Sequence, residues 1–370
     1  MALTLHGTVS DNTVALDRKT ATPLIINGDM AIAQRGTSVT GITGTGYSTL
    51  DRFSLGLSNL GTWTQSQSTD VPNGQGFSNS LKLDCTTANA SPTGTNNMAI
   101  MQRFEGQNLQ MLNKGTSDSE VVTISFWVKS NKTGTYILEL RDADNVRIIC
   151  KAYTIDSANT WEKKLLSFAG DTTGTLDNDN NLSLHARWWL GAGSDFTSGT
   201  LATSWEASTN ANRAVGQVNL ADSTSNDWYI TGIQMEIGTF DANSIPPFQF
   251  EDRATSLARC QRYCYQEDNS DSYHGQLLGF YSSTTLFIGI LSLPVAMRSS
   301  PSITTSGNFQ TGGGGTGSLD LSSIVLSDST GTNLNQVQIR ATVSGGTQGD
   351  ACYFRNKNDT DAVFRLESEL

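Results

Sequence analysis

Short strand-like segments recur along almost the whole chain, and their spacing limits the folds that the chain can adopt. From residue 23 onward, runs of alternating apolar and polar residues are broken by turn residues at intervals of about 8–12 residues. Residues 121–130 (VVTISFWVKS) form the strongest run, and 136–142 and 146–155 continue it as a meander. The pattern predicts an all-β protein with two β-sandwich or jelly-roll domains.

Composition agrees with this fold class and restricts the partners. The chain has 370 residues, enough for two domains, and only 37% of them are hydrophobic and 16% charged. The net charge of −11 disfavours nucleic acid, whose phosphates need clustered Lys and Arg, and it disfavours insertion at anionic membranes. No apolar run approaches the roughly 20 residues that span a bilayer.

Residues 226–266 are predicted to join the two domains. They begin as an alternating strand, pass through Pro246-Pro247, and end in the one segment with a helical period, 251–266. We therefore expect an attachment arm at 1–22, a carbohydrate-binding-like sandwich at 23–250, a connecting helix at 251–266 and a second sandwich at 267–370. The helix carries one apolar stripe, expected to pack on a β domain or on symmetry mates: Ala254, Leu257, Cys260 and Cys264.

The arm at 1–22 has too few apolar residues for a core, so a partner is expected to order it. The start of the chain lacks the basic and apolar regions of a signal peptide. The five cysteines are irregularly spaced and odd in number, which is unlike a disulfide framework. We expect synthesis in a reducing cytoplasm and release on a particle.

No catalytic set is predicted. His6, His185 and His274 have no carboxylate or Cys at metal-ligand spacing, and no nucleophile elbow is present. A glycosidase pair stays open because the chain has acidic residues in turns and strands, namely Asp142, Asp144, Asp171 and Glu236. The preferred interpretation is a non-enzyme without metal or cofactor.

A calcium site is a second open question. Asp171, Asp177 and Asp179 lie in one loop, and carboxylates are hard oxygen ligands. The EF-hand spacing is absent, however, and Asp and Asn are ordinary turn residues. Turn formation is the favoured interpretation.

Tryptophans are the candidates for ligand binding. Flat aromatic faces on a sandwich can stack on sugar rings, and the candidates are Trp63, Trp188, Trp189 and Trp205. Trp188 and Trp189 are adjacent, so on a strand they face opposite ways, one in the core and one at the surface or a subunit contact. The alternative for all four is packing in a core or an oligomer interface.

Several segments together resemble a family of phage virion proteins of the marine-phage tail or fibre type. They are INGDMAIAQRGTS (26–38), LDRF (50–53), ISFWVKSNKTGTY (124–136), GDTTGT (170–175), LGAGSDF (190–196), YITGIQMEIG (229–238), FQFEDR (248–253) and CQRYCYQ (260–266). The resemblance covers roughly 20–270. It implies a carbohydrate-binding-like jelly roll on a virion, used for adhesion or structural decoration, and such proteins are usually homotrimers.

These observations favour a non-enzymatic virion protein of a tail fibre or host-contact appendage. It is expected to bind other virion proteins through 1–22 and to present β domains to host-surface glycans, with no nucleic-acid partner. The alternatives are a capsid decoration or head-fibre protein of the same fold, and a polysaccharide depolymerase. A free carbohydrate-binding module is a weaker alternative.

Overall fold

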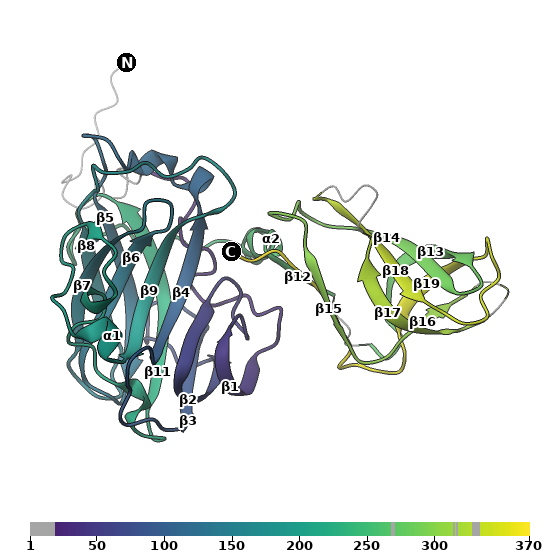
Figure 1. Cartoon of the computed structure of the whole chain (residues 1–370), viewed down its shortest axis with the longest axis horizontal. Coiled ribbons are helices and arrows are strands. Elements are labelled where there is room, and N and C mark those ends of the chain that lie inside the picture. Colours follow the sequence, from purple (N-terminus) through teal and green to yellow (C-terminus); the bar gives the residue numbers. More distant parts are fainter. Residues whose placement is uncertain (1–18, 268–270, 314, 316, 328–333) are drawn as a thin grey trace, which may run out of the picture. The chain divides into compact units, whose positions relative to one another are not determined.

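The computed structural model describes residues 19–267, 271–313, 315, 317–327 and 334–370. Two compact units divide the chain, Met1–Asp252 and Arg253–Leu370. Strands dominate both units (Figure 1), which confirms the all-β class. Among the described residues, no helix is both long enough and apolar enough to span a bilayer.

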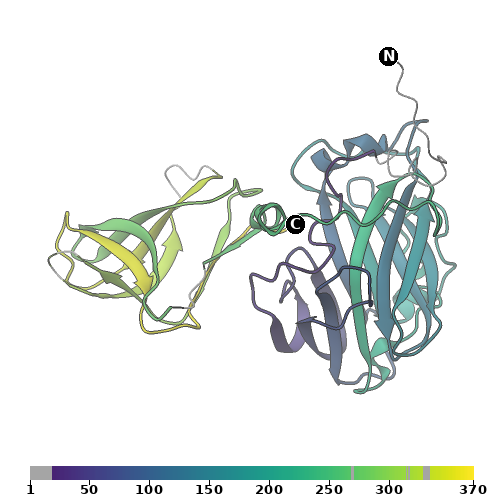
Figure 2. The ribbon, with the colours of Figure 1, turned by 180° about the vertical axis from the view of Figure 1, so that it is seen from behind.

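The first unit is a β-sandwich whose strands all pair antiparallel, in the order β10-β7-β6-β9-β4-β2-β3-β11-β5-β8 (Figures 1 and 2), while β1 pairs with β2. A short helix, α1 (Ser194–Thr197), follows β9. The strands are β1 (Ser38–Gly46), β2 (Ser54–Ser68), β3 (Ser80–Thr87), β4 (Asn97–Glu105), β5 (Val122–Ser130), β6 (Gly134–Asp142), β7 (Arg147–Ile155), β8 (Glu162–Phe168), β9 (Leu182–Ala192), β10 (Glu206–Ala207) and β11 (Asp227–Ile237).

The long strand β2 takes part in both layers of the sandwich. Its first half, Ser54–Ser58, pairs with β4, and its second half, Thr62–Ser68, pairs with β3. Between the halves, Asn59 and Gly61 have positive φ angles of 48° and 80°, which turn the strand. We call the sheet β10-β7-β6-β9-β4 with the first half of β2 layer A, and the second half of β2 with β3-β11-β5-β8 layer B.

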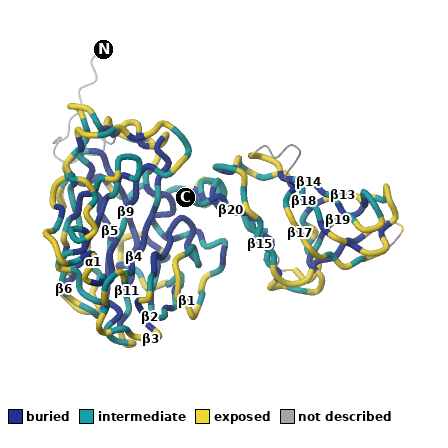
Figure 3. The backbone as a smooth tube through the Cα atoms, viewed as in Figure 1, coloured by how far each residue is buried: buried dark blue, intermediate teal, exposed yellow. Residues whose placement is uncertain are grey.

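Side chains from both layers form one core between them. Phe126 on β5 meets Trp188 on β9 edge to face, with ring centroids 5.9 Å apart. Alternation along β5 turns Ile124, Phe126 and Val128 inward, where each is fully buried. Figure 3 shows buried residues concentrated along the central strands of this unit, as expected for a core between two sheets.

The outer face of layer A carries a second apolar cluster. Trp189 packs there with Phe196 of α1, at a centroid distance of 5.2 Å. Residues of the segment after β9, including Ala202 and Ala214, complete the cover over β6, β7 and β9. This cover explains how two adjacent tryptophans on one strand are both buried.

Over its described residues, the second unit contains one helix, α2 (Arg253–Gln261), and two groups of strands (Figure 1). We expected a sandwich over 267–370, whereas six strands close into a barrel in the order β13-β14-β18-β17-β16-β19, beside a separate sheet β12-β20-β15. Short strands with frequent turns satisfy either arrangement, so the pattern alone does not distinguish them. The strands are β12 (Cys264–Gln266), β13 (Gly275–Ser283), β14 (Leu286–Ser292), β15 (Ser302–Ser306), β16 (Phe309–Gly312), β17 (Asp320–Leu326), β18 (Gln336–Thr342), β19 (Ala351–Asn356) and β20 (Val363–Glu367).

The helix predicted over 251–266 is shorter than expected. It ends at Gln261, and the chain then enters β12, where Cys264 pairs with Glu367 of β20. Residues 264–266, expected in the last helical turn, instead form strand hydrogen bonds with β20. Cys260 and Cys264 are buried within this part of the chain, Leu257 is half-buried, and Ala254, predicted to lie on the same stripe, is exposed.

Most of the predicted attachment arm, residues 1–18, lies outside the described residues. Its last residues run along the first unit. The Lys19 ammonium lies 2.6 Å from a carboxylate oxygen of Glu120, and the Gln249 amide donates to the carbonyl oxygen of Ala21 at 2.6 Å. All five cysteines are buried, and none of them forms a disulfide bond.

Candidate functional site

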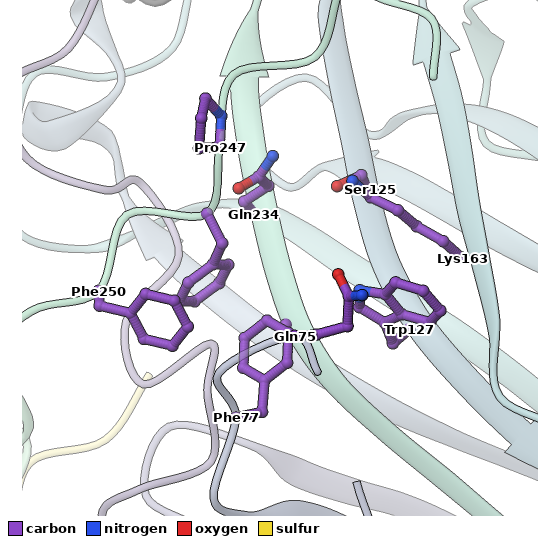
Figure 4. Close-up of a pocket in the computed structure, with 10 residues that line it drawn as sticks. Gln75, Phe77, Ser125, Trp127, Lys163, Gln234, Pro247 and Phe250 are labelled. Carbon is purple, nitrogen blue, oxygen red and sulfur yellow. The ribbon is translucent and has the colours of Figure 1, made fainter. Parts of the chain in front are cut away.

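A groove on the outer face of layer B is the candidate site (Figure 4). Strands β11, β5 and β8 form its floor, and the segments 75–77 and 247–250 form its wall. Its volume is about 250 Å³. We call it the aromatic groove, and its lining residues are Gln75, Phe77, Ser125, Trp127, Lys163, Gly232, Gln234, Pro247, Phe248 and Phe250.

Three phenylalanines form the wall. Phe248 and Phe250 lie 4.8 Å apart between ring centroids, and Phe77 lies 5.0 Å and 5.2 Å from them. Phe250 keeps half of its surface exposed. Gly232 has φ +61° and stands beneath Phe77, because a Cβ there would come within 2.5 Å of the Phe77 ring. The site therefore depends on a glycine for both its backbone and its close packing.

The register between neighbouring strands determines which side chains form the floor of the groove. Ser125 on β5 stands opposite Gln234 on β11, and Trp127 stands opposite Lys163 on β8. Because Phe126 points into the core, its neighbour Trp127 must point outward, and it is half-buried at the groove.

Polar groups stand among these aromatic rings. Gln234 is 6% exposed, its Nε2 donates to the carbonyl oxygen of Pro246 at 3.0 Å, and its Oε1 has no hydrogen-bond partner among the described residues. A buried acceptor without a partner costs about 1–3 kcal/mol. The Lys163 side chain extends from β8 across β5 toward Ser125 (Figure 4), and partial burial lowers the pKa of its ammonium.

A second aromatic group continues the same outer face. The Lys129 ammonium lies 4.2 Å from the ring centroid of Tyr229 and 5.5 Å from that of Trp161, and it pairs with Asp70. Partial burial raises the pKa of Asp70, but hydrogen bonds from Lys129 and Trp161 outweigh it, so the net pKa is lowered. Burial raises the pKa of Tyr229 to about 12, so its hydroxyl stays protonated at neutral pH.

The lining of the groove combines apolar rings with a few polar groups. None of its described lining residues is a carboxylate, so it lacks the acid pair that glycoside hydrolysis requires. It offers apolar ring faces with an amide acceptor, a hydroxyl and an ammonium among them. Such a mixture of apolar surface and a few placed polar groups is typical of small-ligand sites.

The sequence-based prediction of sugar stacking is wrong for three of its four tryptophans. Trp63, Trp188 and Trp189 are fully buried. Trp63 and Trp188 belong to the core between the layers, and Trp189 belongs to the outer cluster of layer A, where its indole donates to Glu139 at 2.7 Å. No ligand ring can reach a side chain without exposed surface.

Trp205 is half-buried and lies away from the groove. Its indole donates to the carbonyl oxygen of Ala169 at 2.7 Å, and the Lys114 ammonium lies 5.3 Å from its ring centroid. Trp205, Lys114 and Asp171 line a cavity of only about 20 Å³, which is too small for a sugar ring. The sequence candidates are therefore not brought together.

The acidic loop is built from local bonds. Asp171 accepts from Arg147 at 2.7 Å and pairs with Lys114 at 3.1 Å, and Asp179 accepts from the backbone of Asn181. The backbone nitrogen of Asp177 donates to Asp144. Over the described parts of the chain, no group of three or more His, Cys, Asp or Glu could hold a metal ion.

The remaining candidate acids and bases lie apart from the groove lining. His185 is buried on β9 in layer A, and His6 lies outside the described residues. Asp142 is fully buried and pairs with Lys114 at 2.5 Å. Glu236 is 6% exposed on β11, two residues beyond Gln234.

The residues that form the groove were not among the sequence candidates. Trp127 could have been found, because alternation in the strongest strand places it opposite Phe126. Phe248 and Phe250 follow the Pro-Pro break, where the sequence predicted only a joint between domains. Their contact with Phe77 spans about 170 residues of chain, and no local pattern encodes it.

No protein-family model matches the chain, and no curated protein sequence matches it. Similar solved structures include the enzymatically active domain of tailspike protein 4 of bacteriophage CBA120, at 13% identity and a TM-score of 0.31. That alignment covers 58% of this chain but only 21% of the tailspike domain, so the chain spans about a fifth of its length.

Carbohydrate-binding modules are also similar. A family 11 module from Clostridium thermocellum, solved with a β-1,3-1,4-mixed-linked tetrasaccharide, has 12% identity and a TM-score of 0.27, over 56% of this chain and 99% of that one. The C-terminal family 22 module of Clostridium thermocellum Xyn10B has 10% identity and a TM-score of 0.26, over 50% and 87%. These scores mark distant similarity.

Proposed function

We propose that the first unit binds a glycan in the aromatic groove and does not cleave it. The observation that carries this proposal is the exposed ring of Phe250 and the half-buried ring of Trp127, which line one groove together with the polar side chains of Gln234, Ser125 and Lys163. A sugar presents C–H faces that pack on aromatic rings and hydroxyls that hydrogen-bond to amides.

The polar groups suit hydroxyls better than a charged ligand. Gln234 supplies an acceptor, Ser125 a donor and acceptor, and Lys163 one positive charge at the groove edge. A groove of about 250 Å³ accommodates one or two sugar rings, below the usual range for drug-sized ligands. A glycan chain running across the face would continue toward Tyr229 and Trp161.

The biological setting that we propose is a virion. The set of motifs from INGDMAIAQRGTS to CQRYCYQ resembles phage virion proteins, and this resemblance supports a tail fibre or host-contact appendage. Residues 1–22 would attach the protein to the particle, and the β domains would face the host surface, as a homotrimer. A capsid decoration protein of the same fold is the alternative, and copy number per particle distinguishes the two.

Binding is tested with a panel of soluble neutral and acidic polysaccharides in affinity electrophoresis. The wild-type chain should be retarded by at least one of them, and Trp127→Ala should lose the retardation. Reducing-end release is assayed on the same panel. Cleavage that a single carboxylate substitution abolishes would favour the depolymerase alternative and contradict the non-enzymatic proposal.

Attachment is tested separately. Deleting residues 1–22 should abolish incorporation into particles and leave polysaccharide retardation unchanged. Normal incorporation of the truncated chain would remove the arm from the proposal, without affecting the groove.

A further inference from the structure

A row of basic side chains crosses the outer face of layer A, on the opposite side of the sandwich from the aromatic groove. Arg103 on β4, His185 on β9 and Arg141 on β6 stand directly opposite one another in the strand register. Arg187 lies on the same face two residues beyond His185. Cross-strand neighbours have Cβ atoms about 5 Å apart, so these four side chains form one compact group, which we call the arginine cluster.

Donors in this cluster lack partners. Among the described residues, the side chains of Arg141 and Arg187 make no hydrogen bond or ion pair, and the Nε atoms of both are buried. The Arg187 guanidinium lies 5.1 Å from the ring centroid of Trp189. His185 is 7% exposed, and its Nδ1 likewise has no partner there. Arg103 is held in place by its bonds to the Tyr47 hydroxyl at 3.1 Å and to Ser54 at 3.2 Å.

The nearby carboxylate is already engaged. Glu139 stands opposite Arg187 in the register, but it receives three hydrogen bonds from Arg213 at 2.8–3.2 Å and one from Trp189 at 2.7 Å. Glu105, further along β4, accepts from Gln107. Four arginines, Arg103, Arg141, Arg187 and Arg213, thus stand near two fully buried acids, Glu139 and Glu105, in a chain whose net charge is −11.

Burial and crowding of positive charge also lower the pKa values of His185 and Arg187. Burial, followed by the charges of Arg187, Arg103, Arg141 and Arg213, lowers the pKa of His185 to about 2. Burial and the neighbouring arginines lower the pKa of Arg187 to about 10. Uncompensated positive charge at partly buried donors costs free energy, and a bound anion would remove that cost.

We propose that the arginine cluster binds a compact oxyanion, a carboxylate, sulfate or phosphate group, between Arg141 and Arg187. Guanidinium forks match the paired oxygens of such groups, and several forks on one rigid sheet give a preorganised site. His185 stands between Arg103 and Arg141 in the strand register and is neutral at neutral pH, so it separates the guanidinium groups without adding charge. The site is independent of the aromatic groove, because the two lie on opposite outer faces of the sandwich.

Isothermal titration of the full chain tests the proposal. Sodium glucuronate, sulfate and inorganic phosphate are used as probes, at constant ionic strength set with chloride. We expect saturable binding of at least one probe to one site, and the three probes show which oxyanion the site prefers. Absence of saturable binding of all three would overturn the proposal.

Variants locate the site. Arg141→Gln and Arg187→Gln should each weaken binding about tenfold or more, since each removes charge-assisted hydrogen bonds. Lys357→Gln, which removes one exposed positive charge from the second unit, should leave it unchanged. Equal weakening by Lys357→Gln would show general charge attraction and contradict a built site.

Arg187→Lys separates the two contributions of the arginine. It keeps the charge and loses the fork, so binding should fall between that of the wild type and Arg187→Gln. Circular dichroism and the unfolding midpoint confirm that each variant is folded. A lysine variant that binds as tightly as the wild type would contradict fork recognition.

Discussion

The side-chain amide of Gln234 donates to the main-chain carbonyl of Pro246 at 3.0 Å. This bond fastens the Pro-Pro segment to strand β11 and thereby holds Phe248 and Phe250 against Phe77. One residue thus both holds the wall of the aromatic groove and keeps a buried acceptor, its Oε1, without a hydrogen-bond partner among the described residues. The segment that breaks the secondary-structure pattern becomes part of the proposed binding site.

Gly232→Ala should destabilise the first unit and distort the groove. The new methyl group meets the Phe77 ring, and φ +61° already strains an alanine by about 1–2 kcal/mol. Gly216→Ala is the matched control, because Gly216 also has positive φ (+87°) but no atom within 4 Å of the added Cβ. Chemical denaturation should show a larger loss for Gly232→Ala, by about 1 kcal/mol or more. Equal losses would mean that the Phe77 contact is easily relieved.

Glu139→Gln should cost about 3–5 kcal/mol in free energy of unfolding, because it leaves buried Arg213 without its charge partner. Asp84→Asn breaks the Lys82–Asp84 pair, whose side chains are 25% and 36% exposed, and should cost less than about 1 kcal/mol. Denaturant titration of both variants measures the contrast. A small cost for Glu139→Gln would show that Arg213 finds water or another acceptor.

His185 should make the first unit less stable as pH falls. Its pKa is about 2 in the folded state, whereas an unperturbed histidine, as in the unfolded chain, has a pKa of 6.5. Between these values the unfolded chain binds a proton that the folded chain does not, so stability is full above pH 6.5 and decreases below it. From about pH 6.5 to about pH 5.5 the loss should be about 1 kcal/mol in buffer without oxyanions.

His185→Gln should remove this part of the pH dependence. His274→Gln, at a half-buried site in the second unit, should leave it in place. The measurement is the denaturation midpoint of the first unit at each pH. Parallel curves for wild type and His185→Gln would contradict a buried neutral histidine.

Leu257→Asp tests the proposed role of α2 in the oligomer. Leu257 is half-buried, and a charge there should loosen a trimer or destabilise the second unit by about 1 kcal/mol or more. Ala254→Asp, at an exposed position of the same helix, is the control. Light scattering and thermal unfolding report the two effects. An unchanged trimer of unchanged stability would make α2 a solvated spacer.

The sequence predicted the strands well where alternation was strong. Residues 121–130 form β5 almost as expected, and the meander that follows forms β6 and β7. Alternation records which face is buried but says nothing about what covers the opposite face. For this reason one of Trp188 and Trp189 was predicted at a surface or a subunit contact, although the segment around Phe196 buries Trp189.

The site was less predictable because its parts are distant in sequence. Phe77, Trp127 and Phe250 meet only after layer B has formed, and none belongs to a recognisable motif. In the same way, the helical period of 251–266 was real up to Gln261, after which pairing of Cys264 with β20 decided the conformation. In the groove and at the end of α2, contacts between residues distant in sequence decide the structure, and local propensity does not.

The most direct test of the central claim is the affinity of the retained glycan for aromatic-to-alanine variants. Phe250→Ala and Trp127→Ala should each weaken binding about tenfold or more, as expected when a central contact is truncated. Tyr273→Ala removes an equally exposed ring from the second unit, 51% against 50%, and should bind as the wild type does. Unchanged affinity in both groove variants would contradict glycan binding in the aromatic groove.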